Sequence, residues 1–250
     1  MVEIVLNERE WTEQMIAAQS LGTSPTITLG RLARYYYSQG YKKRNIQRML
    51  EEYLVRCNPY VTLSRWADTL AYYARTCDKY PLHEIDHIGI TQAELDAIAT
   101  AETVNQRKLL FTLVCLAKYN NMINPRNNNW VNQDAKTIFP LANIAMSVTR
   151  KNAMINKLWT AGYVTFSQIV DNTNLNVSII DDEGEEVLQV SDMRNLGNQY
   201  LMYRGEPYIE CAECGLVIKK ASNSHKYCKD CAAAVNVQST MARRLEAIIA

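Results

Sequence analysis

Apolar side chains recur at helical spacing through the first eighty residues. In the segment 42–57, Ile46, Leu50 and Leu54 fall on one face of a helix. Similar stripes predict helices over 7–21, 29–39 and 62–77, which Gly22, Gly40 and Asn58-Pro59 separate. Because the connections between these helices are short, residues 1–82 are predicted to form a compact helical domain.

A further helix is predicted where Thr91 and Glu94 form the capping-box pattern T-x-x-E, and its apolar positions continue to about Tyr119. The segment 120–136 then contains seven asparagines and a proline, a composition typical of loops. Trp130-Val131 is predicted to form a brief strand within this loop.

The clearest order of elements runs from 137 to 190. Helices are predicted over 138–145 and 148–161, with a tight turn at Met146-Ser147 between them and Gly162 as the end of the second. Alternating segments at 163–170 and 175–181 predict a hairpin, and a further strand is predicted at 186–190. With the preceding helix and the strand at Trp130-Val131, this order resembles a winged helix-turn-helix domain, which we place at 90–203.

The helix 148–161 is the candidate reading helix of such a domain. Its apolar residues share one face and are predicted to pack inward: Val148, Ile155, Leu158 and Trp159. Thr149, Arg150 and Lys157 are predicted to point outward, with Asn156 at the edge of that face, where such side chains contact base edges and phosphates. From Ala135 to Val170 the chain has four Lys or Arg and no acidic residue, which suits this use.

The acidic residues that follow favour a different partner. The formal net charge of the chain is only +1, yet the segment 168–192 contains seven acids and no Lys or Arg. Acids in the wing of a DNA-binding domain would be repelled by phosphate. The alternative is therefore docking on a protein through the acidic turn: Asp181, Asp182, Glu185 and Glu186.

Four of the seven cysteines form two C-x-x-C pairs separated by thirteen residues: Cys211, Cys214, Cys228 and Cys231. Two such turns supply four thiolates to one tetrahedral zinc ion. His225 is an alternative ligand, but four thiolates already complete the shell. Because no position is left for a catalytic water, we predict a structural zinc ribbon, with a terminal helix, over 205–250. A redox or disulfide role for the pairs fits less well, because the chain shows no thioredoxin-like pattern and no sign of export.

The stretch YIECAECGLVIKKASNSHKYCKDCAAAVN resembles the small zinc ribbons at the end of uncharacterised phage and mobile-element proteins of Gram-positive bacteria. The segments LARYYYSQGYKKRNI and FTLVCLAKYNNMINPRNNNWVN are also similar to parts of such proteins. The resemblance implies a phage-type protein that binds nucleic acid in transcription control or replication. The alternative is one that docks on a host protein machine, such as RNA polymerase or a defence nuclease of the CRISPR type.

No motif for phosphate cradling, nucleophilic catalysis or catalytic metal binding occurs, and the chain has only nine glycines. We therefore expect a binding protein, with no enzymatic activity and no small-molecule substrate. The longest apolar stretch is far short of the ~20 residues of a membrane span. The expected location is the cytoplasm of a bacterial host cell, and the expected fold class is mainly α with small sheets (α+β).

The tyrosines of the N-terminal segment allow two interpretations. Tyr35, Tyr36, Tyr37 and Tyr41 lie among basic residues, as do Tyr72 and Tyr73, and tyrosine rings can stack on nucleic-acid bases. Helical spacing places some of these rings on the faces that pack inward. We favour a packing role for them.

Overall fold

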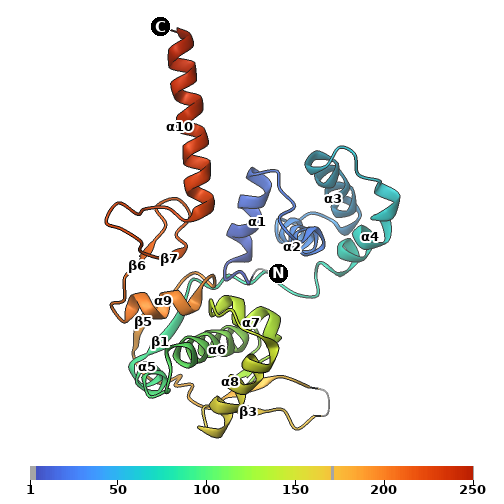
Figure 1. Ribbon diagram of the computed structural model, residues 1–250. Coiled ribbons are helices and arrows are strands. Elements are labelled where there is room, and N and C mark those ends of the chain that lie inside the picture. The colour runs from blue at the N-terminus through green and yellow to red at the C-terminus, as the bar shows by residue number, and fades with distance from the viewer. Residues whose placement is uncertain (1–3, 170–171, 250) are drawn as a thin grey trace. The chain divides into compact units, whose positions relative to one another are not determined.

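The structure is a computed structural model that describes residues 4–169 and 172–249 (Figure 1). It contains helices and small antiparallel sheets, in agreement with the predicted α+β class. The chain divides into two compact units, unit 1 (Met1–His87) and unit 2 (Ile88–Ala250), which we describe separately. The cysteine-containing segment 205–250 belongs to the same unit as 90–203.

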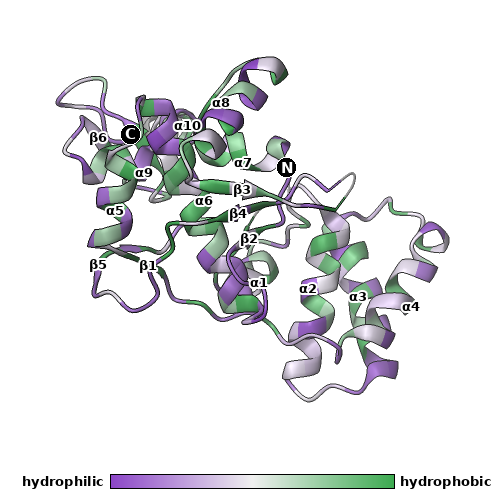
Figure 2. Ribbon diagram, turned by 90° about the horizontal axis from the view of Figure 1, so that it is seen from below, coloured by the Kyte–Doolittle hydropathy of each residue, from purple (hydrophilic) through white to green (hydrophobic). Residues whose placement is uncertain are grey.

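Unit 1 is helical. Its elements are α1 (Glu8–Ala17), α2 (Pro25–Ser38), α3 (Lys43–Cys57), the 3-10 turn η1 (Leu63–Arg65) and α4 (Ala67–Thr76). The predicted stripes form its core, in which Leu29, Leu50 and Leu70 are fully buried. Hydrophobic residues lie on α2 and α3 where the two helices adjoin (Figure 2).

The predicted cap of the first helix is confirmed, but the helix is shorter than predicted. The side chain of Asn7 accepts a hydrogen bond of 3.0 Å from the Glu10 amide. The helix ends at Ala17, because Gln19 takes a left-handed conformation with φ of 47°. Backbone hydrogen bonds join the first and last segments of unit 1. The Glu8 amide donates to the His83 carbonyl oxygen, and the Ile85 amide donates to the Leu6 carbonyl oxygen.

Unit 2 is built around one buried helix. Where the sequence predicts a single helix from Thr91 to about Tyr119, the structure has α5 (Gln92–Ala99) and α6 (Val104–Ile123). The prediction of one helix is wrong because Thr103 and Gln106 form a second capping box, which starts a new helix. In unit 2, α5, α7 (Ala135–Leu141), α8 (Val148–Thr160) and α9 (Leu196–Tyr203) all contact α6 (Figure 1).

In the described part of unit 2, the strands form three small antiparallel sheets. The predicted hairpin is present as β3 (Val164–Phe166) and β4 (Leu175–Val177), and β2 (Trp130–Val131) adds to it in the order β2-β4-β3. The predicted first strand is longer, and its last residue, Val170, lies outside the described residues. The strand at 186–190, β5 (Glu186–Val190), pairs instead with β1 (Ile88–Thr91).

The third sheet belongs to the cysteine segment. It joins β6 (Tyr208–Glu210) to β7 (Val217–Lys219), and α10 (Lys229–Ile249) follows. Both strands contact α9, so this segment packs on the rest of unit 2. Among the described residues, no helix combines the length and apolar character needed to cross a membrane.

Candidate metal centre

The first cysteine pair lies on the turn between β6 and β7. The Cys211 amide donates to the Leu216 carbonyl oxygen, and the Gly215 amide donates to that of Cys211, both at 2.9 Å. Gly215 has a φ of 71°, a left-handed conformation that glycine adopts without strain. The turn therefore directs the sulfurs of Cys211 and Cys214 to the same side.

The second pair lies at the start of α10. The Ala232 amide bonds the Cys228 carbonyl oxygen at 2.8 Å, which makes Cys228 the residue that opens the helix. The Cys228 amide points at the Cys211 sulfur at 3.2 Å, and the Cys231 amide points at the Cys228 sulfur at 3.5 Å. Backbone N–H groups at a helix start favour thiolate over thiol.

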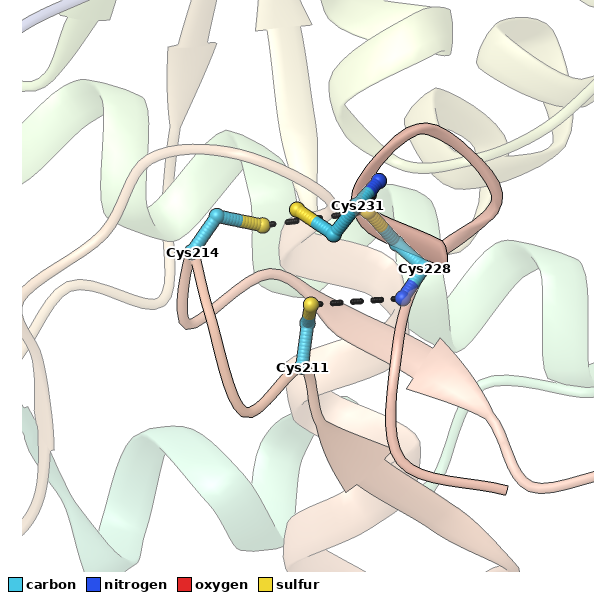
Figure 3. A group of neighbouring side chains, drawn as sticks. All are labelled: Cys211, Cys214, Cys228 and Cys231. Carbon is cyan, nitrogen blue, oxygen red and sulfur yellow. Dashed lines mark hydrogen bonds between the residues drawn. The ribbon is translucent and has the colours of Figure 1, made fainter. Parts of the chain in front are cut away.

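All four sulfurs converge (Figure 3). They lie within 4.8 Å of one another, and those of Cys214 and Cys228 are 3.8 Å apart. Four sulfurs bound at about 2.3 Å to a central tetrahedral ion lie about 3.8 Å from each other. The cluster could hold one metal ion, and among the described residues it is the one such group of histidine, cysteine or acidic side chains.

The surroundings of Cys211, Cys214 and Cys231 shift the pKa values of these three thiols in different directions. Burial raises the pKa of Cys211, but amide hydrogen bonds from Cys228, Cys214 and Glu213 outweigh burial and lower it to about 6. Burial raises the pKa of Cys214, and hydrogen bonding with the neighbouring thiols raises that of Cys231. A metal ion that binds here must therefore displace protons from Cys214 and Cys231, the thiols whose pKa is raised beside Cys211.

His225, the alternative ligand, is engaged elsewhere. Its Nδ1 accepts a hydrogen bond of 3.0 Å from the Ala221 amide, which leaves Nε2 to donate to the Tyr227 carbonyl oxygen at 3.0 Å. The ring therefore shapes the loop between the two cysteine pairs. It does not belong to the cluster.

Side chains outside the segment hold the first cysteine turn in place. Arg194 bonds the Asp192 carboxylate and donates a second bond of 2.6 Å from Nη2 to the Cys214 carbonyl oxygen. Asn195 and Asn198 both donate to the Val217 carbonyl oxygen, at 3.2 and 3.0 Å. Nothing in the sequence pattern indicated these roles, because the bonds join residues about twenty positions apart.

The four candidate nucleic-acid-binding residues of α8 are all exposed: Thr149, Arg150, Asn156 and Lys157. Lys157 forms an exposed ion pair with Glu102 at 3.3 Å. Together with Asn156, it lines a shallow pocket beside the loop between α5 and α6. The outward face of α8 is thus polar, but its second half borders one acidic side chain.

The predicted inward face of α8 is wrong in part. Leu158 is buried and Ile155 half-buried, whereas Val148 is 72% and Trp159 52% exposed. The helix instead packs through the side that carries Lys151, whose ammonium lies 5.0 Å from the centre of the Phe139 ring. Trp159 packs on Phe166 of β3, with 5.8 Å between ring centroids, at the edge of the helix.

In the acidic turn, Asp181 forms hydrogen bonds within the fold, and the other three predicted residues face solvent. Asp182, Glu185 and Glu186 are exposed. The Asp181 carboxylate accepts hydrogen bonds from the Thr91 hydroxyl and from the Glu183 and Gly184 amides, and these bonds lower its pKa. Asp181 therefore holds the turn together, and Asp171 of the same acidic segment lies outside the described residues.

In comparisons with known proteins, no family model, no curated sequence and no solved structure matches the chain. The residues and their geometry are accordingly the basis of the functional proposal.

Proposed function

We propose that this chain is a nucleic-acid-binding protein that contacts duplex DNA through α8 and holds one structural zinc ion between its four cysteines. The observation that carries the proposal is the exposure of α8. Leu158 is its one fully buried residue, although the helix has thirteen residues and adjoins a hydrophobic core. A helix exposed to this extent is free to enter a groove.

The surrounding elements support a winged helix-turn-helix interpretation. Two consecutive helices, α7 and α8, are followed directly by the β3–β4 hairpin, and β2 completes the sheet. In helix-turn-helix domains the second helix of such a pair lies in the major groove and presents its N-terminal residues to base edges. Thr149 and Arg150 occupy that position in α8.

The chemistry of the outward face fits this use. Asn156 can form a bidentate pair with adenine, and Arg150 can contact guanine or phosphate. Lys136, exposed on α7, adds positive charge to the same pair of helices. The Glu102–Lys157 pair opposes the proposal at one end of α8, where we expect contacts to be weaker.

Zinc is the metal we propose for the cysteine cluster. Soft thiolate ligands in tetrahedral array favour zinc or iron–sulfur chemistry, and zinc is the usual occupant of two C-x-x-C turns. Because four protein ligands fill the shell, the ion would stabilise the segment 205–250 and take no part in a reaction. Given the resemblance in its sequence, the setting we propose is transcription control or replication in a phage.

The test compares two charge reversals of equal size in the full-length protein. Arg150→Glu with Lys157→Glu changes α8, and Arg126→Glu with Arg204→Glu changes exposed residues elsewhere in unit 2. We expect the α8 variant to lose duplex affinity and about one unit of log–log salt slope per lost phosphate contact. Equal duplex binding by the two variants, both folded by circular dichroism, would contradict the proposal.

Docking on a host protein machine is the second candidate, and one observation favours it. Trp159 and Phe166 are both exposed and lie side by side, with 5.8 Å between ring centroids, and large apolar side chains gathered on a surface typically mark protein contacts. Neutralising Asp182, Glu185 and Glu186 tests the predicted acidic docking turn, and Asp181 is left unchanged because it holds the turn. A pull-down of host proteins that this change abolishes, with no duplex affinity in the parent, would favour docking.

A further inference from the structure

In unit 1, the start of α3 meets the end of α4 at one end of this helix pair. There, the Lys43 ammonium bonds the Asp78 carboxylate at 2.7 Å and the Arg75 carbonyl oxygen at 3.0 Å. These contacts place the start of α3 beside the end of α4. We name the segments 37–44 and 72–80, which meet there, the basic tyrosine surface.

Positive charge is concentrated on this surface. Its two segments contain five Lys or Arg and one acid, Asp78, whereas the rest of residues 1–87 contains six Lys or Arg and nine acids. Lys43 engages Asp78, and the other cations of the surface are exposed: Lys42, Arg44, Arg75 and Lys79. Unit 1 as a whole is nearly neutral, so the charge is segregated onto one end of the helix pair.

Exposed aromatic rings lie among these cations. Tyr37, Tyr41 and Tyr72 are 43%, 46% and 53% exposed. Tyr41 is held edge-on by half-buried Tyr36 at 6.1 Å, and Tyr72 by half-buried Tyr73 at 5.7 Å between ring centroids. Tyr36 and Tyr73 pack on the core, which confirms the packing role for them but not for the exposed rings.

The rings and the cations are close enough to act together. The Arg75 guanidinium lies 5.9 Å from the centre of the Tyr72 ring. The pKa of Lys43 is raised mainly by its bond to Asp78, with a smaller contribution from the Tyr37 hydroxyl. Fixed aromatic rings beside exposed cations are the pattern by which proteins bind unpaired nucleic-acid strands, with bases on the rings and phosphates on the cations.

We propose that the basic tyrosine surface binds single-stranded nucleic acid. An acidic peptide would satisfy the cations but would make no use of the exposed rings. A duplex would satisfy the cations while keeping its bases stacked away from the rings. The surface belongs to unit 1 and does not depend on α8.

The test uses the full-length protein and a fluorescent oligothymidine of about 20 nucleotides. Lys42→Glu with Arg44→Glu changes the surface, and Arg126→Glu with Arg204→Glu makes the same charge change on exposed residues of unit 2. We expect the first variant to bind about tenfold more weakly, with a salt slope lower by about 0.7 per lost contact. The control variant should bind within about twofold of the parent, since it leaves the surface intact.

Stacking is tested by a second pair of variants. Tyr72→Leu should weaken binding by about fivefold or more, because one stacked base is lost, whereas Tyr72→Phe keeps the ring and should bind as the parent does. Equal weakening by the two charge-reversed variants would overturn the proposal. So would equal binding by Tyr72→Leu and Tyr72→Phe, or tighter binding of polyglutamate than of oligothymidine.

The α8 variant separates this inference from the proposed function. Arg150→Glu with Lys157→Glu should reduce duplex binding and leave oligothymidine binding unchanged. If that variant alone abolishes binding to the single strand, the basic tyrosine surface is not the binding site. If duplex binding proves absent in the parent while the single-strand results are as expected, the inference about unit 1 stands and the proposal for α8 fails.

Discussion

The guanidinium of Arg194 and the backbone carbonyl of Cys214 are joined by a hydrogen bond of 2.6 Å, so a side chain preceding α9 holds one turn of the cysteine cluster. Asp192 fixes the guanidinium from the other side through bonds of 2.7 to 3.0 Å. The cluster is therefore positioned by the neighbouring fold as well as by its own hairpin.

Removing this contact should weaken metal retention. Arg194→Ala leaves all four thiolates in place but frees the first turn and the Cys214 carbonyl. Loss of groups that orient metal ligands typically costs about 10- to 100-fold in metal affinity, and we expect about tenfold here. The measurement is zinc transfer to a chromogenic chelator. Arg204→Ala, an exposed change at the end of α9, should release zinc at the parent rate.

The cysteines themselves should determine the metal content. We expect about one zinc ion per chain in freshly purified, reduced protein. Cys214→Ser or Cys228→Ser should lose the ion and the hydrogen-exchange protection of β6 and β7, because metal binding and folding of such segments are coupled. Cys57→Ser, which changes a half-buried thiol of unit 1, should keep both. Elemental analysis that finds no zinc in the parent would contradict this expectation.

The parts of the structure that follow from the sequence are those specified by local spacing. The stripe around Leu50 predicts α3 to within one residue, because a helix that buries every third or fourth side chain has one possible core face. The paired C-x-x-C turns likewise require only local geometry and one ion. Thr91 and Glu94 form the predicted capping box for the same reason.

The parts that do not follow depend on distant residues. The inward face of α8 is determined by where Phe139 and the core lie, and Val148 and Trp159 share an apolar stripe that this core does not cover. Spacing gives relative angles around a helix but not the side that meets the core. Similarly, the Arg194–Cys214 bond spans twenty positions, and no periodic pattern encodes it.

Gly197 illustrates a tight helix contact that can be tested directly. A Cβ atom there would collide with the Ala142 carbonyl oxygen and would lie 2.6 Å from Cε of Lys108. Gly197→Ala should therefore force α9 away from Ala142 at the end of α7 and cost about 1–3 kcal/mol or more, measured by thermal unfolding. Gly30→Ala, also within a helix, meets only the Tyr73 ring at 3.2 Å. Its effect should be smaller, within about 1 kcal/mol, and equal effects would show that α9 can move freely.

Unit 1 contains a buried carboxylate whose charge should make its stability depend on pH. Glu8 is 5% exposed, and its oxygens bond Arg31 at 3.0 Å and Arg34 at 2.7 Å. Burial raises the pKa of Glu8. Hydrogen bonds from Arg34 and from the His83 amide lower it, as does the positive charge of Arg31, and together they hold this pKa below the ordinary 4.5. Since the folded pKa is the lower one, the charged form stabilises unit 1 above about pH 4.5. That contribution is lost as the pH falls through the folded pKa.

Glu8→Gln should therefore destabilise unit 1 at neutral pH and flatten this acid dependence. Removing one partner from a buried ion cluster leaves Arg31 and Arg34 without their counter-charge, at a cost of about 3 kcal/mol. The measurement is hydrogen exchange of the α1 and α2 amides between neutral pH and about pH 3. Glu10→Gln, an exposed neighbour on the same helix, is the matched control and should keep the parent's pH dependence. If Glu8→Gln lost protection with acid as steeply as the parent, another carboxylate would be responsible for the transition.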